Sequence, residues 1–318
     1  MKLLPLALVL ALPLGASAQE SGSFDRTLSV DGHVNLEVHS GAGSVRITPG
    51  PSDTVSIHGE IRVRSSSSRT SEARDQVRRI EEQPPINQEG NVIRIGMHRD
   101  DRFDGLSISY EIRVPTDTSL VSRTGSGSQS IGDFRGPVEA RTGSGSIKIG
   151  ATGASVEAAT GSGSIEIESA RGRVELKTGS GSITAKEVEG PITARSGSGS
   201  IELEQAGEGD VDVSSGSGSI RVSGIRGGLD ADAGSGSIRV AGELAGDWHL
   251  EASSGRVTVE LADDASFELD ARTRSGSIDL DHPVMMTGGA STKRLQGTVR
   301  DGGYRLEIES GSGGIVIR

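Results

Sequence analysis

Apolar and polar residues alternate along short segments of this chain, and the same pattern returns at a fixed interval. Val174 to Thr178 and Ile183 to Lys186 each alternate in this way, which is typical of a β-strand with one buried face. The tetrapeptide GSGS, Gly179 to Ser182, lies between them. Its glycines predict a turn that uses positive φ angles. One unit therefore predicts two short strands joined by a turn.

The GSGS tetrapeptide begins at seven positions whose spacing is 18 or 19 residues. A fixed period near twenty residues is typical of a solenoid, in which each unit buries a face only by stacking on its neighbours. The high glycine content and the absence of a 3.6-residue period exclude a helical repeat. We therefore predict an all-β fold, a parallel β-solenoid (β-helix) of about 18-residue coils. GSGS begins at Gly125, Gly143, Gly161, Gly179, Gly197, Gly216 and Gly234.

Aligning the coils in chain order predicts two apolar columns that run the length of the stack. Each column places β-branched or aliphatic residues at the same position of successive coils, and we expect these ladders to form the core. The first column is Val138, Val156, Val174, Ile192, Val211, Leu229, Trp248 and Leu269. The second column is Ile147, Ile165, Ile183, Ile201, Ile220, Ile238, Val257 and Ile278.

The chain begins with features of an export signal. Met1-Lys2 precedes an apolar run that ends at Leu14, and Ala16-Ser17-Ala18 follows as a small-residue cleavage site. This run is shorter than the roughly 20 residues needed to span a bilayer. We therefore predict that residues 1–18 are a signal peptide and that the mature chain is exported without a transmembrane segment.

Residues 19–120 are less regular than residues 121–318, which we predict to be the β-solenoid repeat domain. The earlier region contains one coil-like segment, several strand-like segments and one short helix near residues 70–83. The helix is predicted from the apolar spacing of Ala73, Val77 and Ile80 and from Pro84-Pro85, which ends it. We expect this β-rich region to cap the end of the stack, with the helix packed over it, because solenoids protect their terminal edges. The alternative is that the helical segment is a flexible charged insertion.

Two columns are candidates for an interaction surface, an outward-facing acidic column and a column of hydroxyl residues. The acidic column could bind divalent cations through its oxygen atoms, but interleaved Lys and Arg residues favour a solvated face with cross-strand ion pairs. A regular hydroxyl column just before each turn could bind ice or a flat polysaccharide, although such hydroxyls more often satisfy local backbone groups. The candidate residues are Glu139, Glu157, Glu175, Asp212, Asp230, Thr142, Thr160 and Thr178.

Composition excludes several functions. A formal net charge of −11 argues against a nucleic-acid partner, and seven aromatic residues in 318 leave little for stacking on sugars. The chain has no cysteine and no GxSxG, HExxH or phosphate-loop motif, so we expect no enzyme, no metal site and no cofactor. If a catalytic pair exists, Asp230 and Asp232 are the best candidates, in the manner of β-helix enzymes that act on polysaccharides.

The segment LEVHSGAGSVRI (Leu36–Ile47), the segment YEIRVP (Tyr110–Pro115) and the tandem TGSGSIxI repeats resemble one family. It is a family of exported bacterial β-strand-repeat proteins called "putative adhesin", related to auto-transporter adhesin heads and otherwise of unknown function. The resemblance implies a non-catalytic adhesin or cell-envelope interaction module, periplasmic or at the cell surface, whose partner is an unknown envelope or surface polymer or protein. The alternatives are a polysaccharide-active β-helix enzyme and a periplasmic structural or stress-response protein.

Overall fold

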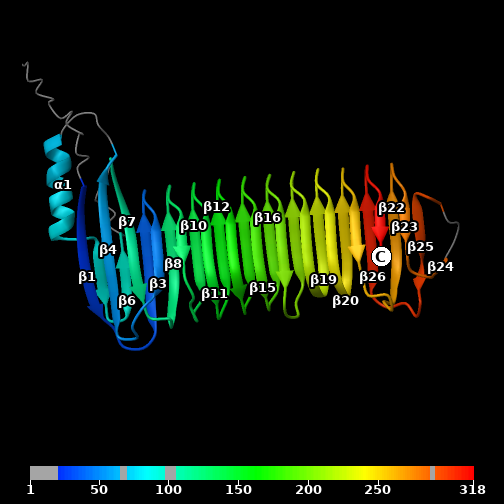
Figure 1. The fold of residues 1–318 in the computed structure, drawn as a ribbon, viewed down its shortest axis with the longest axis horizontal. Coiled ribbons are helices and arrows are strands. Elements are labelled where there is room, and N and C mark those ends of the chain that lie inside the picture. The colour runs from blue at the N-terminus through cyan, green and yellow to red at the C-terminus, as the bar shows by residue number, and fades with distance from the viewer. Residues whose placement is uncertain (1–20, 65–69, 97–104, 287–290) are drawn as a thin grey trace, which may run out of the picture.

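The protein is a straight rod of stacked β-strands (Figure 1). The computed structural model describes residues 21–64, 70–96, 105–286 and 291–318, so the signal peptide predicted at residues 1–18 lies outside the described residues. One helix lies at the N-terminal end, and two antiparallel strands lie at the other end. The strands between them run across the long axis of the rod, so successive coils stack along it.

The repeats form two parallel ladders that are joined within each coil by the GSGS turn. One ladder contains β10, β12, β14, β16, β18 and β19. The other contains β11, β13, β15, β17 and β19. Strand β19 is long enough to belong to both ladders, because its first part pairs with β17 and its last part with β18. These ladders confirm the predicted parallel β-solenoid. The strands are β10 (Val138–Thr142), β11 (Ile147–Thr152), β12 (Val156–Thr160), β13 (Ile165–Ala170), β14 (Val174–Thr178), β15 (Ile183–Val188), β16 (Ile192–Ser196), β17 (Ile201–Gln205), β18 (Val211–Ser215) and β19 (Ile220–Ala233).

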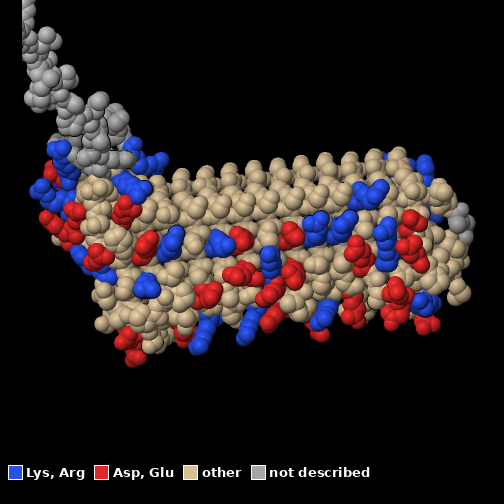
Figure 2. Space-filling view, in the orientation of Figure 1, with Lys and Arg blue, Asp and Glu red and all other residues tan. Residues whose placement is uncertain are grey.

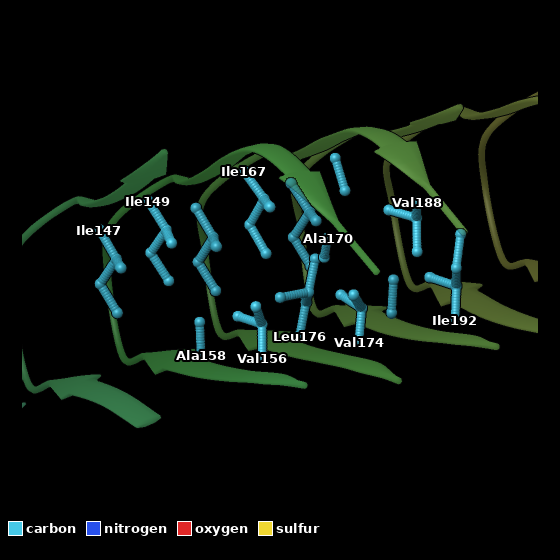
Figure 3. Close-up of a cluster of buried hydrophobic side chains, with 14 of the residues drawn as sticks. Ile147, Ile149, Val156, Ala158, Ile167, Ala170, Val174, Leu176, Val188 and Ile192 are labelled. Carbon is cyan, nitrogen blue, oxygen red and sulfur yellow. The ribbon is translucent and has the colours of Figure 1, made fainter. Parts of the chain in front are cut away.

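Charged side chains lie in rows along the outside of the rod, below an uncharged ridge (Figure 2), whereas aliphatic side chains from both ladders point toward one another inside it (Figure 3). The two predicted apolar columns are buried throughout, except that Ile278 near the end is only partly buried. Trp248 is also fully buried, and its indole N–H donates a hydrogen bond to the carbonyl of Gly227 at 3.0 Å. The alternation of the sequence therefore separates the inside of the rod from its outside correctly.

The structural reason for glycine in the GSGS turns differs from the predicted one. Throughout the part of the chain that the structure describes, no glycine of a GSGS turn has a positive φ angle. A Cβ added at Gly161 would instead approach the carbonyl oxygen of Gly143 to 2.5 Å, and one at Gly163 would overlap the carbonyl of Gly145. The prediction of positive φ is wrong here. Glycine is required because each turn packs directly on the turn before it.

Strands and a helix close the N-terminal end. Antiparallel strands β1, β4 and β7 extend one ladder, and helix α1 packs on β1 through Val77 and Ile80. The Ser23 backbone N–H donates to Glu81 Oε1 at 3.0 Å, so the helix occupies part of the open strand edge. The elements are β1 (Ser21–Ser29), β4 (Thr54–Val63), α1 (Thr70–Glu82), β5 (Ile86–Glu89), β6 (Val92–Ile95) and β7 (Leu106–Val114).

The first coil-like segment also joins the stack. It contains β2 (Val34–Ser40) and β3 (Val45–Pro49), which pair in register with β8 (Thr118–Thr124) and β9 (Gln129–Ile131) of the next coil. Regular stacking therefore includes a coil from residues 19–120, and the segment between Thr54 and Val114 is an insertion that builds the cap.

At the C-terminal end the coils do not stack in chain order. The last coil, β26 and β27, lies between the coil of β20 and β21 and the coil of β22 and β23. The expected succession from Trp248 to Leu269 is therefore wrong, because Leu306 lies between them. Because the last coil lies between two other coils, its apolar residues Leu306, Ile308, Ile315 and Ile317 are fully buried.

The hairpin of β24 and β25 then closes this end by antiparallel pairing with β22. The C-terminal strands are β20 (Ile238–Ala252), β21 (Val257–Glu260), β22 (Phe267–Thr273), β23 (Ile278–Leu280), β24 (Val284–Met286), β25 (Arg294–Val299), β26 (Arg305–Ser310) and β27 (Ile315–Ile317). Both ends of the rod therefore finish in antiparallel strands, and its middle is purely parallel.

Candidate interaction surface

The outer face of the β10–β20 ladder carries two adjacent charged columns, which we call the charged strip. Its first column contains the five predicted acidic residues, at the same register position of β10, β12, β14, β18 and β19, with Thr193 at that position of β16. The second column, two residues further along each strand, begins with Arg123 and Arg141. The strip comprises Glu139, Glu157, Glu175, Asp212 and Asp230 with Arg123, Arg141, Lys177, Arg195 and Asp232.

Ion pairs link the two columns between coils and within them. Arg123 Nη2 lies 2.7 Å from Glu139 Oε1, in the next coil, and Arg195 Nη2 lies 2.6 Å from Asp212 Oδ2. Arg141 pairs with Glu157 of the next coil in the same way. The strip is thus a ladder of ion pairs, as the interleaved basic residues predict.

These ion pairs contribute little to stability because they are open to solvent. The acidic side chains from Glu139 to Asp212 are between 26% and 49% exposed, and exposed pairs are worth about 0–1 kcal/mol each. A hydrogen bond from Lys177, whose Nζ lies 2.6 Å from Glu175 Oε1, and the lysine's charge lower the pKa of Glu175. The main effect of the pairs is to hold charged groups at regular positions on the surface.

The sign of the second column changes along the rod. It is basic through Arg195, and then Ser214 is followed by Asp232 and Glu251. Partial burial, followed by the charges of Asp230 and Glu251, raises the pKa of Asp232. The strip therefore has a balanced N-terminal half and an acidic C-terminal part. Within that part, Asp232 retains its proton to a higher pH than an isolated aspartate does.

The predicted hydroxyl column is not on the surface. Thr142, Thr160 and Thr178 are each only 6% exposed. Their hydroxyls donate to backbone carbonyls in the turn of the preceding coil, at distances of 2.8 to 3.0 Å. The expectation that these three hydroxyls present a binding surface is therefore wrong. They satisfy turn carbonyls, which is the more common role of hydroxyls beside turns.

Two features of the surface are not evident from the sequence. Arg123 extends the basic column into the coil before the first full repeat, and Glu307 stands between His249 and Asp270 in the acidic column. The alternation in residues 305–310 marks that segment as a strand, but its position in the stack depends on the hairpin at the C-terminal end. Within the described residues, no three His, Asp or Glu side chains converge as metal ligands would.

A family model matches residues 33–318, which is nearly the whole of the described rod. The chain belongs to the Toastrack DUF4097 family. The expectation of a β-strand-repeat family of unknown function is thus confirmed. No curated protein matches this Toastrack chain. No helix in the described ranges is both long enough and apolar enough to span a membrane.

Several solved structures are similar to this Toastrack chain. A "putative cell adhesion protein" from Clostridium sporogenes ATCC 15579 is 11% identical, with 94% of this chain and 99% of that chain covered and a TM-score of 0.21. A "putative adhesin" from Bacteroides fragilis NCTC 9343 is 10% identical, with coverages of 93% and 97% and a TM-score of 0.28. A "putative lipid binding protein" from Parabacteroides distasonis ATCC 8503 is also 10% identical, with coverages of 93% and 96% and a TM-score of 0.28.

Proposed function

We propose that this protein is an exported, non-catalytic interaction module that acts as an adhesin at the cell surface. The observation that carries the proposal is the charged strip, a flat and regular array of solvent-exposed ion pairs that extends over many coils. Such an array gives a partner many weak polar contacts in one line, and these add when the partner is itself extended. The export signal predicted at residues 1–18 supports a location outside the cytoplasm.

The expected partner is a polymer or protein of the envelope or of another surface. The strip offers carboxylates, guanidinium groups and an ammonium group at fixed spacing, so recognition relies on hydrogen bonds and charge. Aromatic stacking contributes little, because the single tryptophan, Trp248, is buried. The acidic residues proposed to take part are Glu139, Glu157, Glu175, Asp212 and Asp230.

Co-sedimentation with isolated cell envelopes tests this function. The purified chain should sediment with envelopes, and a variant that neutralises both signs on the strip should remain in solution. That variant is Glu139→Gln, Arg141→Gln, Glu157→Gln, Glu175→Gln and Lys177→Gln. A control on the outer face of the other ladder, from β11 to β19, changes three acids and two bases as well, and should sediment as the natural chain does. It carries Lys148→Gln, Glu166→Gln, Glu168→Gln, Glu202→Gln and Arg221→Gln. Equal sedimentation of both variants would contradict the proposed surface.

One observation favours a second function, a polysaccharide-active enzyme. The pKa of Asp232 is raised, first by partial burial and then by the neighbouring charge of Asp230, and glycosidases use pairs of carboxyl groups in which one has a raised pKa. This function predicts that the natural chain releases reducing ends or unsaturated sugars from an envelope glycan. The variant Asp230→Asn with Asp232→Asn should then abolish the product. Absence of product from every envelope glycan tested would reject this second function.

A further inference from the structure

A shallow groove runs along the rod between the charged strip and the GSGS turns. It crosses strands β8, β10, β12 and β14 and has a volume of about 390 Å³. The basic column forms one side, and the buried threonines and the first glycine of each turn form the floor. On the far side of those glycines lie the exposed serines of the turns, including Ser144, Ser162 and Ser180. Figure 2 shows the uncharged ridge along the top of the rod, seen from the β11–β17 side.

The charged residues that line the groove all have the same sign. They are Arg123, Arg141 and Lys177. The glutamates paired with them belong to the other column of the strip, and among the described residues none of these glutamates lines the groove. An arginine has five N–H donors. Arg141 donates a hydrogen bond to Glu157 through Nη2, and its Nε lies 3.3 Å from Glu139 Oε1, which leaves the two N–H groups of Nη1. The ion pairs thus hold the cations in place and leave donors for a ligand.

The fold does not impose this basic lining. A second groove of about 380 Å³ occupies the same columns near the C-terminal end, on strands β20, β22 and β26. Its charged lining residues are Glu251 and Glu309 together with Arg272 and Arg274. The same positions of the coil therefore carry mixed charge at one end of the rod and only positive charge at the other.

The positions of the cations suit an extended ligand. Arg123 and Arg141 occupy adjacent strands, which are about 4.8 Å apart. Ala159 leaves the next position without a charge, and Lys177 and Arg195 continue the column. Although the whole chain has a net charge of −11, charges are screened beyond about 8 Å at physiological ionic strength. The paired glutamates lie well within that distance of the cations, but they do not line the groove, so a chain bound in it contacts the cations directly.

We propose that this groove binds an acidic polysaccharide, with its chain along the rod and its carboxylates on Arg123, Arg141 and Lys177. Guanidinium groups and carboxylates make strong charge-assisted hydrogen bonds, and the serine ridge can hydrogen-bond to sugar hydroxyls. The inference rests on the proposed surface function and names the class of ligand. A neutral polymer would leave the cations without a new partner and gain only the weaker contacts.

Calorimetric titration of the purified chain with polygalacturonate tests the inference, with neutral dextran as the comparison polymer. The natural chain should bind polygalacturonate and not dextran. The variant Arg123→Gln, Arg141→Gln, Lys177→Gln should bind about tenfold more weakly or not at all. The matched control Lys148→Gln, Arg221→Gln, Arg239→Gln removes the same charge from the other face and should bind as the natural chain does. Equal losses in both variants, or equal binding of dextran, would overturn the inference.

A gain-of-binding variant covers the case in which the triple variant does not fold. Ala159→Arg completes the row of cations and should strengthen the binding of polygalacturonate. Ser214→Arg adds the same charge to the same column outside the groove and should have little effect. If both arginines strengthen binding equally, the groove is not the site. If the natural chain sediments with envelopes but does not bind polygalacturonate, the ligand class is wrong and the surface function stands. If the natural chain neither sediments with envelopes nor binds polygalacturonate, the surface function and the ligand class are both wrong.

Discussion

The hydroxyl of Thr160 donates a hydrogen bond to the carbonyl oxygen of Gly145, in the turn of the preceding coil, at 2.8 Å. Thr178 bonds to Gly163 at the same distance, and Ser196 bonds to Gly181 at 3.0 Å. The hydroxyl column is thus a set of links between successive turns. It explains why a threonine or serine precedes each of these turns.

Thr160→Val should lower the free energy of unfolding by about 0.5–1.5 kcal/mol, because it removes the part-buried hydrogen bond to the carbonyl of Gly145. Thr160→Ser retains the hydroxyl and should lose clearly less. Urea unfolding followed by circular dichroism measures both variants. If the valine variant is as stable as the serine variant, the link between turns does not contribute to stability.

Gly163→Ala should destabilise the rod by about 1–3 kcal/mol, because the new methyl group overlaps the carbonyl of Gly145. Ser162→Ala, at the exposed neighbouring position, is the control and should be neutral. Gly163→Asn separates the two explanations for glycine, since asparagine tolerates positive φ but carries a Cβ. A stable asparagine variant in thermal unfolding would show that conformation, and not close stacking, requires the glycine.

Ile183→Lys should unfold the rod, whereas Thr184→Lys should be tolerated. Ile183 is fully buried, and a charge cannot be buried there without a partner. Thr184 faces outward between Glu166 and Glu202, so a lysine there gains up to a few tenths of a kcal/mol. Circular dichroism and size-exclusion chromatography of the two variants check this. Similar behaviour of both would refute the assignment of inner and outer faces.

Asp232→Asn should stabilise the rod slightly at pH 7, by up to about 0.5 kcal/mol, since the side chain is largely exposed. A carboxyl whose pKa is raised on folding binds its proton more tightly in the folded state, so its ionisation lowers stability. The cost develops as the pH rises from the ordinary pKa of 3.8 through the raised value and is absent below 3.8. Thermal unfolding at pH 3 and pH 7 should therefore show a gain only at pH 7. A gain at both pH values would point to packing as the cause.

Much of the fold could be predicted because each coil repeats the same alternation. The positions of Ile165, Ile183 and Ile201 show which side of each strand is buried, and the spacing of the GSGS turns gives the register. The order of the last coils could not be predicted in this way. Alternation identifies the strand that contains Leu306 but not its neighbours, which depend on the hairpin of β24 and β25.

The candidate surface was only partly predictable for a related reason. Alternation places Glu157 and Arg141 on the outer face, and the structure joins them as a pair. The same alternation places Thr160 on the inner face, where its hydroxyl meets a carbonyl from another coil. A column of hydroxyls in a sequence does not show whether the groups face solvent or a backbone atom that lies one turn away.

Protease treatment of intact cells tests the central claim, that the protein is an adhesin at the cell surface, most directly. The account predicts that the protein is removed while a periplasmic marker is preserved, because an adhesin must be reachable from outside. A sample lysed before treatment shows that the folded rod can be cleaved. Full protection in intact cells, with cleavage after lysis, would contradict the account and favour a structural role inside the envelope.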